Sequence, residues 1–197
     1  MPPIDSPAVK VGVLLARQPD ELGEWLADAM AFEAAGADAL WVDPVPESEL
    51  DPLALAAAIA ALTSRSLLVA ALPVPDRPPE ALAGTLGTIA RLSHGRLALA
   101  ADPGRLEELS GLAPGLVTFR RLPGESGAFE CTRQGGEAER WVQTASPDGR
   151  VAWQAALAGA ADRGDSGLLV AAGPRLLDIL RNPEDPGERS DLMLAQG

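Results

Sequence analysis

The chain has 197 residues, 47% of them hydrophobic, and its 28 acidic and 16 basic residues give a net charge of −12. Such a charge argues against nucleic acid or an anionic membrane as a partner, because both need a basic face. A single cysteine, Cys131, excludes an intramolecular disulfide and fits a reducing cytoplasm, and a single histidine, His94, leaves too few ligands for a zinc site.

No apolar run approaches the roughly 18 residues that cross a bilayer, and the first residues show no basic segment followed by an apolar core. We therefore expect a cytoplasmic protein without a secretion signal. Because residues suited to catalysis are scarce, we also expect that a cofactor supplies any chemistry.

The first hundred residues alternate between apolar runs of strand length and segments with helical periodicity. The predicted strands are residues 9–16, 39–42, 66–72 and 96–101. Helices are predicted after Gln18, from Pro52 to Leu62 and from Pro79 to Arg91. Strands separated by helices of this length run parallel through right-handed crossovers.

The alternation changes after Asp102. A short helix is predicted at 104–112, and residues 116–122 and 128–132 are expected to form an antiparallel hairpin. Strand–helix units then return, with strands at 141–144 and 167–172 and helices at 150–161 and 174–180. The count of six parallel strands plus a hairpin predicts an α/β fold like a trimmed TIM barrel, two strand–helix units short of eight.

Five segments of the N-terminal half occur in a recognisable order. They are Val11-Gly12-Val13, residues 32–42 (FEAAGADALWV), Asp51-Pro52-Leu53, residues 60–63 (AALT) and residues 92–97 (LSHGRL). Over roughly residues 9–101 the chain resembles the bacterial luciferase-like monooxygenase family. The resemblance implies a (β/α)8 barrel and dependence on FMN or a deazaflavin. It also implies one barrel domain over residues 1–197, in which residues 103–140 replace the middle units of the family.

The C-terminal part resembles the family more loosely, through residues 144–147 (TASP) and 164–170 (GDSGLLV). In that family this segment supplies late strands and part of the flavin phosphate site. Hydroxyl residues before a helix N-terminus also leave free backbone N–H groups for an anion. The alternative is that Thr144 and Ser146 only cap the following helix.

Two departures from the family concern the flavin face. The second strand ends at Asp43-Pro44, where the family usually places a histidine. The fourth strand ends in Ala100-Ala101-Asp102 instead of Gly-x-Gly, and each Cβ restricts how closely a cofactor approaches the backbone.

Because strand C-termini meet at one mouth of such a barrel, we predict the cofactor-binding residues to be Arg17, Asp43, Ala71, Asp102, Thr144, Ser146 and Gly173. Arg17 is the only basic side chain among them, so a phosphate is expected to depend on Arg17 and on N–H groups near Ser146 and Gly173. His94 lies in a helix-to-strand joint at the opposite face, so we expect a structural role for it. No catalytic residue and no metal site is assigned.

Three functions are compatible with these observations. The first is a flavin- or deazaflavin-dependent oxidoreductase of the monooxygenase type, with activity reduced by the missing pocket walls. The second is a non-catalytic relative that forms a homodimer, because a barrel lacking two units leaves sheet edges that need cover. The third is a small-ligand binder that uses the same mouth.

Overall fold

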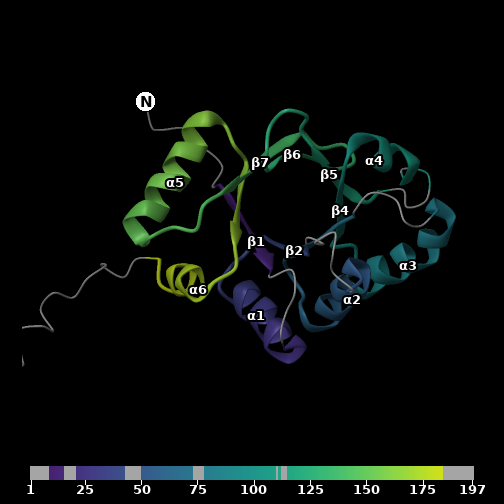
Figure 1. Ribbon diagram of the computed structural model, residues 1–197, viewed down its shortest axis with the longest axis horizontal. Coiled ribbons are helices and arrows are strands. Elements are labelled where there is room, and N and C mark those ends of the chain that lie inside the picture. Colours follow the sequence, from purple (N-terminus) through teal and green to yellow (C-terminus); the bar gives the residue numbers. More distant parts are fainter. Residues whose placement is uncertain are drawn as a thin grey trace, which may run out of the picture.

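The computed structural model describes residues 9–15, 21–42, 50–72, 78–109, 111 and 115–183. Eight strands form a closed barrel (Figure 1). They are β1 (Lys10–Leu15), β2 (Ala39–Val42), β3 (Leu67–Ala71), β4 (Leu97–Ala101), β5 (Val117–Arg121), β6 (Ala128–Thr132), β7 (Glu139–Thr144) and β8 (Gly167–Ala171).

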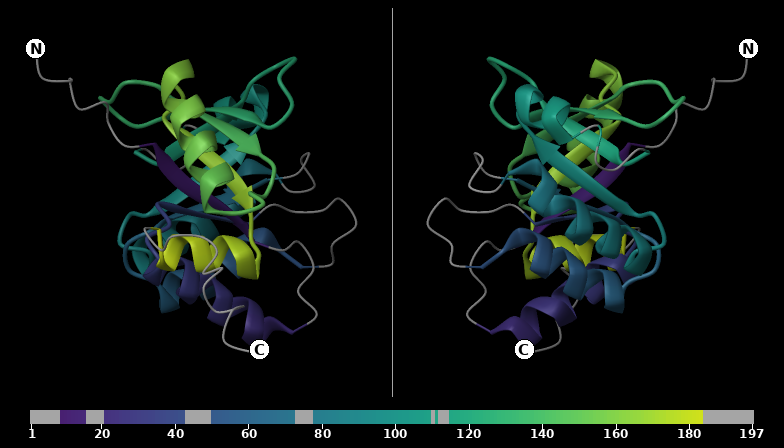
Figure 2. Two further views of the ribbon diagram at one scale, coloured as in Figure 1. Left: turned by 90° about the vertical axis from the view of Figure 1, so that its left-hand side faces the viewer. Right: turned by 90° about the vertical axis from the view of Figure 1, so that its right-hand side faces the viewer.

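Within the described ranges six helices lie around the barrel, as the side views of Figure 2 show. They are α1 (Leu22–Ala34), α2 (Pro52–Leu62), α3 (Pro79–Leu92), α4 (Pro103–Leu109), α5 (Arg150–Arg163) and α6 (Pro174–Arg181). Across the parts of the chain that the structure covers, no helix is long and apolar enough to span a membrane.

The predicted α/β barrel class is confirmed and the eight predicted strands form, but seven of them run parallel instead of six, and the predicted open sheet edges are wrong because the barrel is closed. β5 pairs with β4 in parallel, and β6 lies antiparallel between β5 and β7. Seven strands therefore run one way, β6 runs the other, and β8 pairs with β1 to close the sheet. Because a hairpin needs no crossover helix, β5 and β6 supply two strands of the barrel with few residues. The closed barrel therefore has no exposed sheet edge.

Four aromatic side chains occupy the interior of the barrel. The ring centroid of Trp41 lies 4.7 Å from that of Phe119 and 4.9 Å from that of Phe129, and Phe119 lies 5.5 Å from Trp141. All four are less than 10% exposed. Gly167 sits beside the largest of them, and a Cβ there would overlap the indole of Trp141. The interior is a packed core, as in other barrels of this kind.

Polar side chains of the first four units anchor loops at the N-terminal end of the barrel. The carboxylate of Glu33, at the end of α1, accepts hydrogen bonds from the N–H groups of Ser64, Arg65 and Ser66 at 3.0, 2.7 and 2.9 Å. Burial raises the pKa of Glu33, but these three donors and the charge of Arg96 outweigh it and leave the pKa below its usual value. Glu33 therefore stays ionised and fixes the α2–β3 loop.

Arg96 makes a second anchor beside Glu33. Its guanidinium donates to the carbonyl oxygens of Ser66 and Thr63 at 2.8 and 2.7 Å. The neighbouring His94 is exposed and has a positive φ of 52°, followed by Gly95 at 81°. The joint between α3 and β4 therefore lies at the N-terminal end of the barrel, where the sequence placed it.

None of the described helices covers the outer face of the hairpin (Figure 1). That face carries a charged pair instead. Arg120 Nη2 on β5 lies 2.5 Å from Glu130 Oε1 on β6. Cys131, in contrast, points inward and is fully buried, which raises the pKa of its thiol to about 11. This alternation of polar and apolar positions is typical of an antiparallel sheet that has one face in contact with solvent.

Candidate functional site

The C-terminal mouth of the barrel is where the predicted cofactor-binding residues were expected to meet. Two of them, Arg17 and Asp43, lie outside the described residues. Ala71 is the last residue of β3, is 5% exposed, and belongs to the cluster that fills the barrel interior. It contributes a small apolar surface below the mouth and no polar group.

Asp102 follows β4 and lies at the mouth next to an arginine that the sequence analysis missed. Arg121 Nε is 3.3 Å from Asp102 Oδ1, and its guanidinium carbon lies 5.2 Å from the centroid of the Phe129 ring. Arg121 shares the inward face of β5 with Phe119, two residues earlier. Side chains alternate along a strand, so the buried Phe119 predicts that Arg121 also points inward. That prediction needs the knowledge that residues 117–121 form a strand of the barrel.

Thr144, the last residue of β7, and Ser146, in the loop that follows, lie on the other side of the mouth. Thr144 pairs with Val170, and the alternation from the buried Trp141 puts its side chain on the outer face of the strand. The N-cap of α5 is Gly149, with no hydrogen bond from a side chain. The alternative in which Thr144 or Ser146 caps this helix is therefore wrong.

Gly173 is the N-cap of α6, which also has no hydrogen bond from a side chain at its start. A Cβ at Gly173 would meet nothing within 4 Å, so the backbone there is open to approach. Arg175 Nη1, in the first turn of α6, lies 3.4 Å from Asp148 Oδ1 in the loop after β7. This exposed ion pair links the loop that contains Ser146 to the start of α6.

The predicted residues thus form two groups. Thr144, Ser146 and Gly173 lie together at the ends of β7 and β8, with Arg175 beside them. Asp102 lies at the ends of β4 and β5 with Arg121, and β6 separates the two groups.

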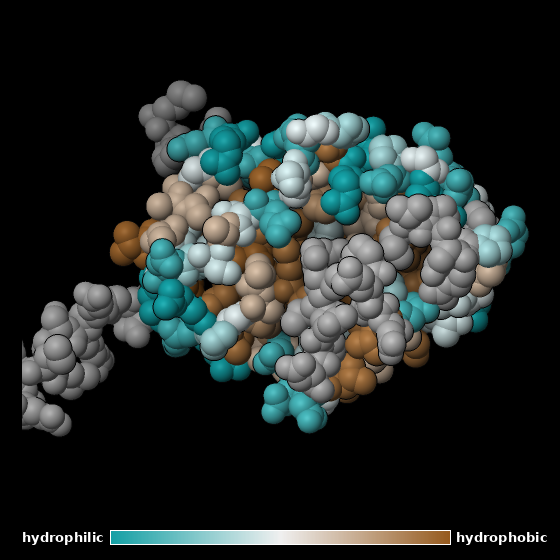
Figure 3. Space-filling view, viewed as in Figure 1, coloured by the Kyte–Doolittle hydropathy of each residue, from teal (hydrophilic) through white to brown (hydrophobic). Residues whose placement is uncertain are grey.

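Each group borders a hollow in the surface. A depression of about 620 Å³ lies between Asp102, Arg121 and the β5–β6 turn at residues 122–127. A cavity of about 330 Å³ lies between α1 and α6, lined by Leu15, Trp25, Asp28, Phe32, Ala172, Gly173, Pro174 and Leu177. In the space-filling view an apolar strip runs over β1 and β8 on this face (Figure 3).

The residues at the C-terminal mouth are compatible with a flat heterocycle that carries a phosphate. Small side chains, Ala71 and Ala100, lie at the ends of the inward faces of β3 and β4, above the aromatic core. Uncapped N–H groups at the starts of α5 and α6 suit an anion. Arg175 adds a positive charge on the same side. No group of three or more metal-ligating side chains occurs in the described part of the chain.

Comparison with known proteins finds one family model that resembles the N-terminal half of the chain. Residues 8–104 match the family model described as luciferase-like monooxygenase. None of the curated proteins matches the sequence.

Solved structures give partial likenesses. EDTA monooxygenase from Chelativorans sp. BNC1 has 18% identity and a TM-score of 0.43, over 48% of this chain and 29% of that one. The oxygenating constituent of 3,6-diketocamphane monooxygenase from Pseudomonas putida, in complex with FMN, has 19% identity and a TM-score of 0.43, over 54% and 33%. A coenzyme F420-dependent tetrahydromethanopterin reductase from Methanopyrus kandleri has 20% identity and a TM-score of 0.43, over 52% and 29%. The matches span about a third of those chains, so they carry no argument about cofactor or substrate.

Proposed function

We propose, from the match of residues 8–104 to the luciferase-like monooxygenase family model, that the C-terminal mouth binds FMN or a deazaflavin and that the protein is a cytoplasmic oxidoreductase of the monooxygenase type. The observation that carries the proposal is the group formed by Ser146, Gly173 and Arg175. It combines uncapped helix N-termini with a cation at the carboxyl ends of β7 and β8, which is an arrangement suited to a phosphate.

When bound, the flavin or deazaflavin would supply the redox chemistry. The residues of this chain would bind and orient it. N–H groups at the starts of α5 and α6, together with Arg175, would hold the phosphate. Ala71 and Ala100 would support the ring system above the aromatic core, which excludes water from below.

The proposal also concerns the domain organisation of the chain. We assign residues 1–197 to one luciferase-like domain in which residues 103–140 stand in place of the family's middle strand–helix units. Within them α4 is only seven residues long, and the hairpin β5–β6 carries no helix between its strands. Fewer helices above the mouth leave a shallower substrate pocket, from which we expect low activity.

A fluorescence titration with FMN and with a deazaflavin tests the proposed site. Ser146→Asp places a negative charge beside the phosphate, in an exposed loop where no described side chain depends on the hydroxyl. We expect this variant to abolish binding of either phosphorylated cofactor, because like charges repel across a short distance.

Gln134→Glu is the matched control for that titration. Gln134 is exposed in the β6–β7 turn, at the opposite end of the barrel, and the variant adds the same charge. It should bind like the wild type. Equal affinity of the wild type and Ser146→Asp would contradict the phosphate site.

A homodimer is a second proposal, but for a reason other than open sheet edges, which the closed barrel removes. Leu62 and Leu92 end the neighbouring helices α2 and α3 and are 46% and 45% exposed. We propose these two exposed apolar side chains, on neighbouring helices, as the surface that contacts a second copy. Light scattering at micromolar concentration should give twice the chain mass of 20.3 kDa, and a monomer mass would contradict this proposal.

A further inference from the structure

The N-terminal end of the barrel contains a cavity of about 580 Å³, away from the proposed cofactor mouth. The β6–β7 turn supplies Arg133 and Glu137 to its wall, and the loop after α5 supplies Ser166. Lys10 and Glu139, the first residues of β1 and β7, line it from the barrel side. No residue assigned to the cofactor lines this cavity, so any ligand here would be a second one.

Two cations face a single carboxylate in this cavity. Lys10 Nζ lies 2.6 Å from Glu139 Oε1, and Arg133 Nε lies 3.9 Å from the same oxygen. The other carboxylate oxygen accepts a hydrogen bond from Trp141 Nε1 at 3.2 Å. Burial raises the pKa of Glu139, but the donors Lys10 and Trp141 and the nearby positive charges lower it overall. Glu139 is therefore ionised, and both of its oxygens are in use.

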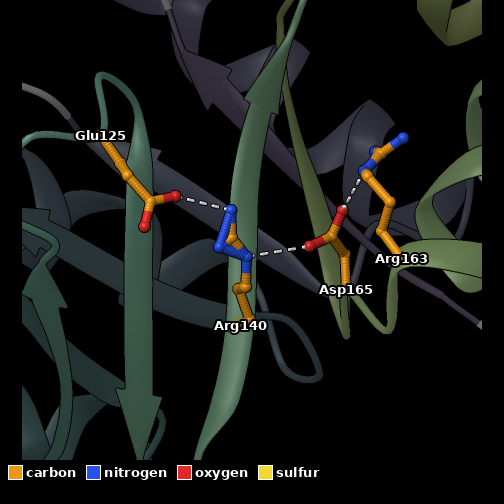
Figure 4. A network of polar contacts seen from close by, with 4 residues as sticks. All are labelled: Glu125, Arg140, Arg163 and Asp165. Atoms are coloured by element: carbon orange, nitrogen blue, oxygen red, sulfur yellow. Dashed lines mark hydrogen bonds and ion pairs between the residues drawn. The ribbon is translucent and has the colours of Figure 1, made fainter.

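The acid on the opposite wall, Asp165, does not neutralise these cations. Its side chain is 1% exposed and lies 3.1 Å from Arg140 Nε and 3.0 Å from Arg163 Nε. Figure 4 shows Asp165 between the two guanidinium groups, with Glu125 on the far side of Arg140. Asp165 is thus already compensated, and the remaining acid of the cavity wall, Glu137, is exposed to solvent.

Arg133 forms a side-chain hydrogen bond with the Cys131 thiol and still keeps N–H donors for a ligand, because a guanidinium carries five of them. It is 45% exposed, and its distance of 3.9 Å from Glu139 is too long for a hydrogen bond. Lys10 has three N–H protons, of which Glu139 takes one. A guanidinium and an ammonium that share one cavity match the geometry of an oxyanion, which accepts from both.

We propose that this cavity binds a small metabolite through an oxyanion group, either a carboxylate or a phosphate. Arg133 and Lys10 would donate to the oxyanion, and Ser166 lies in the same wall. The proposal is independent of the flavin site because the two sites share no residue.

The indole N–H of Trp141 provides a direct readout, because it donates to the same carboxylate as Lys10. We would record its ¹⁵N-resolved NMR signal, assigned with Trp141→Phe, during titration with inorganic phosphate and, separately, with succinate, at an ionic strength held constant with chloride. A saturable shift is expected with at least one anion. The anion that produces the shift identifies the preferred oxyanion.

Arg133→Gln should weaken this binding about ten-fold, the effect of losing roughly 1.4 kcal/mol. Arg120→Gln is the control, because Arg120 is paired with Glu130 on the outer face of the hairpin and should leave affinity unchanged. Glu137→Gln removes a competing carboxylate from the cavity wall and should tighten binding. It also keeps the proposal testable if Arg133→Gln folds poorly.

Three results would overturn the proposal. One is a shift that grows linearly without saturation for both anions. Another is equal affinity in the wild type, Arg133→Gln and Glu137→Gln. The third is loss of the shift in Ser146→Asp, which would place the anion at the C-terminal mouth instead.

Discussion

The first four strands and the hairpin region complete the same barrel in different ways. β2, β3 and β4 are buried along their whole length, because helices cover their outer faces. β5 and β6 contain both buried and more exposed residues, and a charged pair takes the place of a helix on their outer face. The difference shows that an antiparallel hairpin can close a mostly parallel barrel without helical cover when its outer face is polar.

The two regions also contribute differently to the proposed site. The first four units hold buried polar anchors, such as Glu33 and Arg96, at the end of the barrel remote from the mouth. The hairpin region contributes Arg121 to the mouth itself. In barrels of this type, residues at the N-terminal face usually contribute to stability and residues at the C-terminal face bind the ligand.

Removing one carboxylate from each region is the strongest test of this comparison. Glu33→Ala leaves three backbone N–H groups without their acceptor, and we expect a loss of about 3 kcal/mol in the free energy of unfolding. Glu130→Ala on the hairpin removes only a surface ion pair, at a cost of about 0.5 kcal/mol. Urea unfolding of both variants measures the difference, and equal losses would contradict the comparison.

The aromatic core that packs behind the hairpin is tested at a glycine of β8. Gly167→Ala places a Cβ against the Trp141 ring, and overpacking of this kind costs about 2 kcal/mol. Gly87→Ala, on α3 with nothing within 4 Å, should stabilise the protein by about 0.5 kcal/mol. Thermal unfolding of the two variants checks the signs. A stable Gly167→Ala would show that the aromatic core is loosely packed.

The contribution of Glu33 should also depend on pH. Its pKa is lowered in the folded protein, so its stabilisation is complete above the unfolded value of about 4.3. The stabilisation is lost as the pH falls through the folded pKa. The gap in unfolding free energy between the wild type and Glu33→Ala should therefore narrow below about pH 4. A gap that stays constant down to pH 2 would contradict an ionised Glu33.

Sequence patterns predicted the first half of the barrel well, because each strand–helix unit there is local. The predicted helix from Pro52 to Leu62 is confirmed to the residue, and Asp51 accepts from the N–H of Leu53 as its N-cap. The hairpin at 116–122 and 128–132 was also predicted within one residue at each described end.

The pairing of the hairpin with β4 and β7 could not be predicted in the same way. Those contacts join segments far apart in sequence, and no local signal specifies them. Arg121 and Arg175 were missed for the same reason. Each becomes a candidate only through a distant partner, Asp102 for the first and Asp148 for the second.

The affinity ratio of FMN to riboflavin tests the proposed cofactor site most directly, because the two differ by the phosphate alone. Charge-assisted hydrogen bonds to a phosphate are worth about 1.5–3 kcal/mol. We therefore predict saturable fluorescence quenching by both compounds, with FMN bound at least about ten-fold more tightly. Equal affinities would contradict the phosphate site at Ser146, Gly173 and Arg175. Saturable binding of neither compound would contradict an FMN site at the C-terminal mouth.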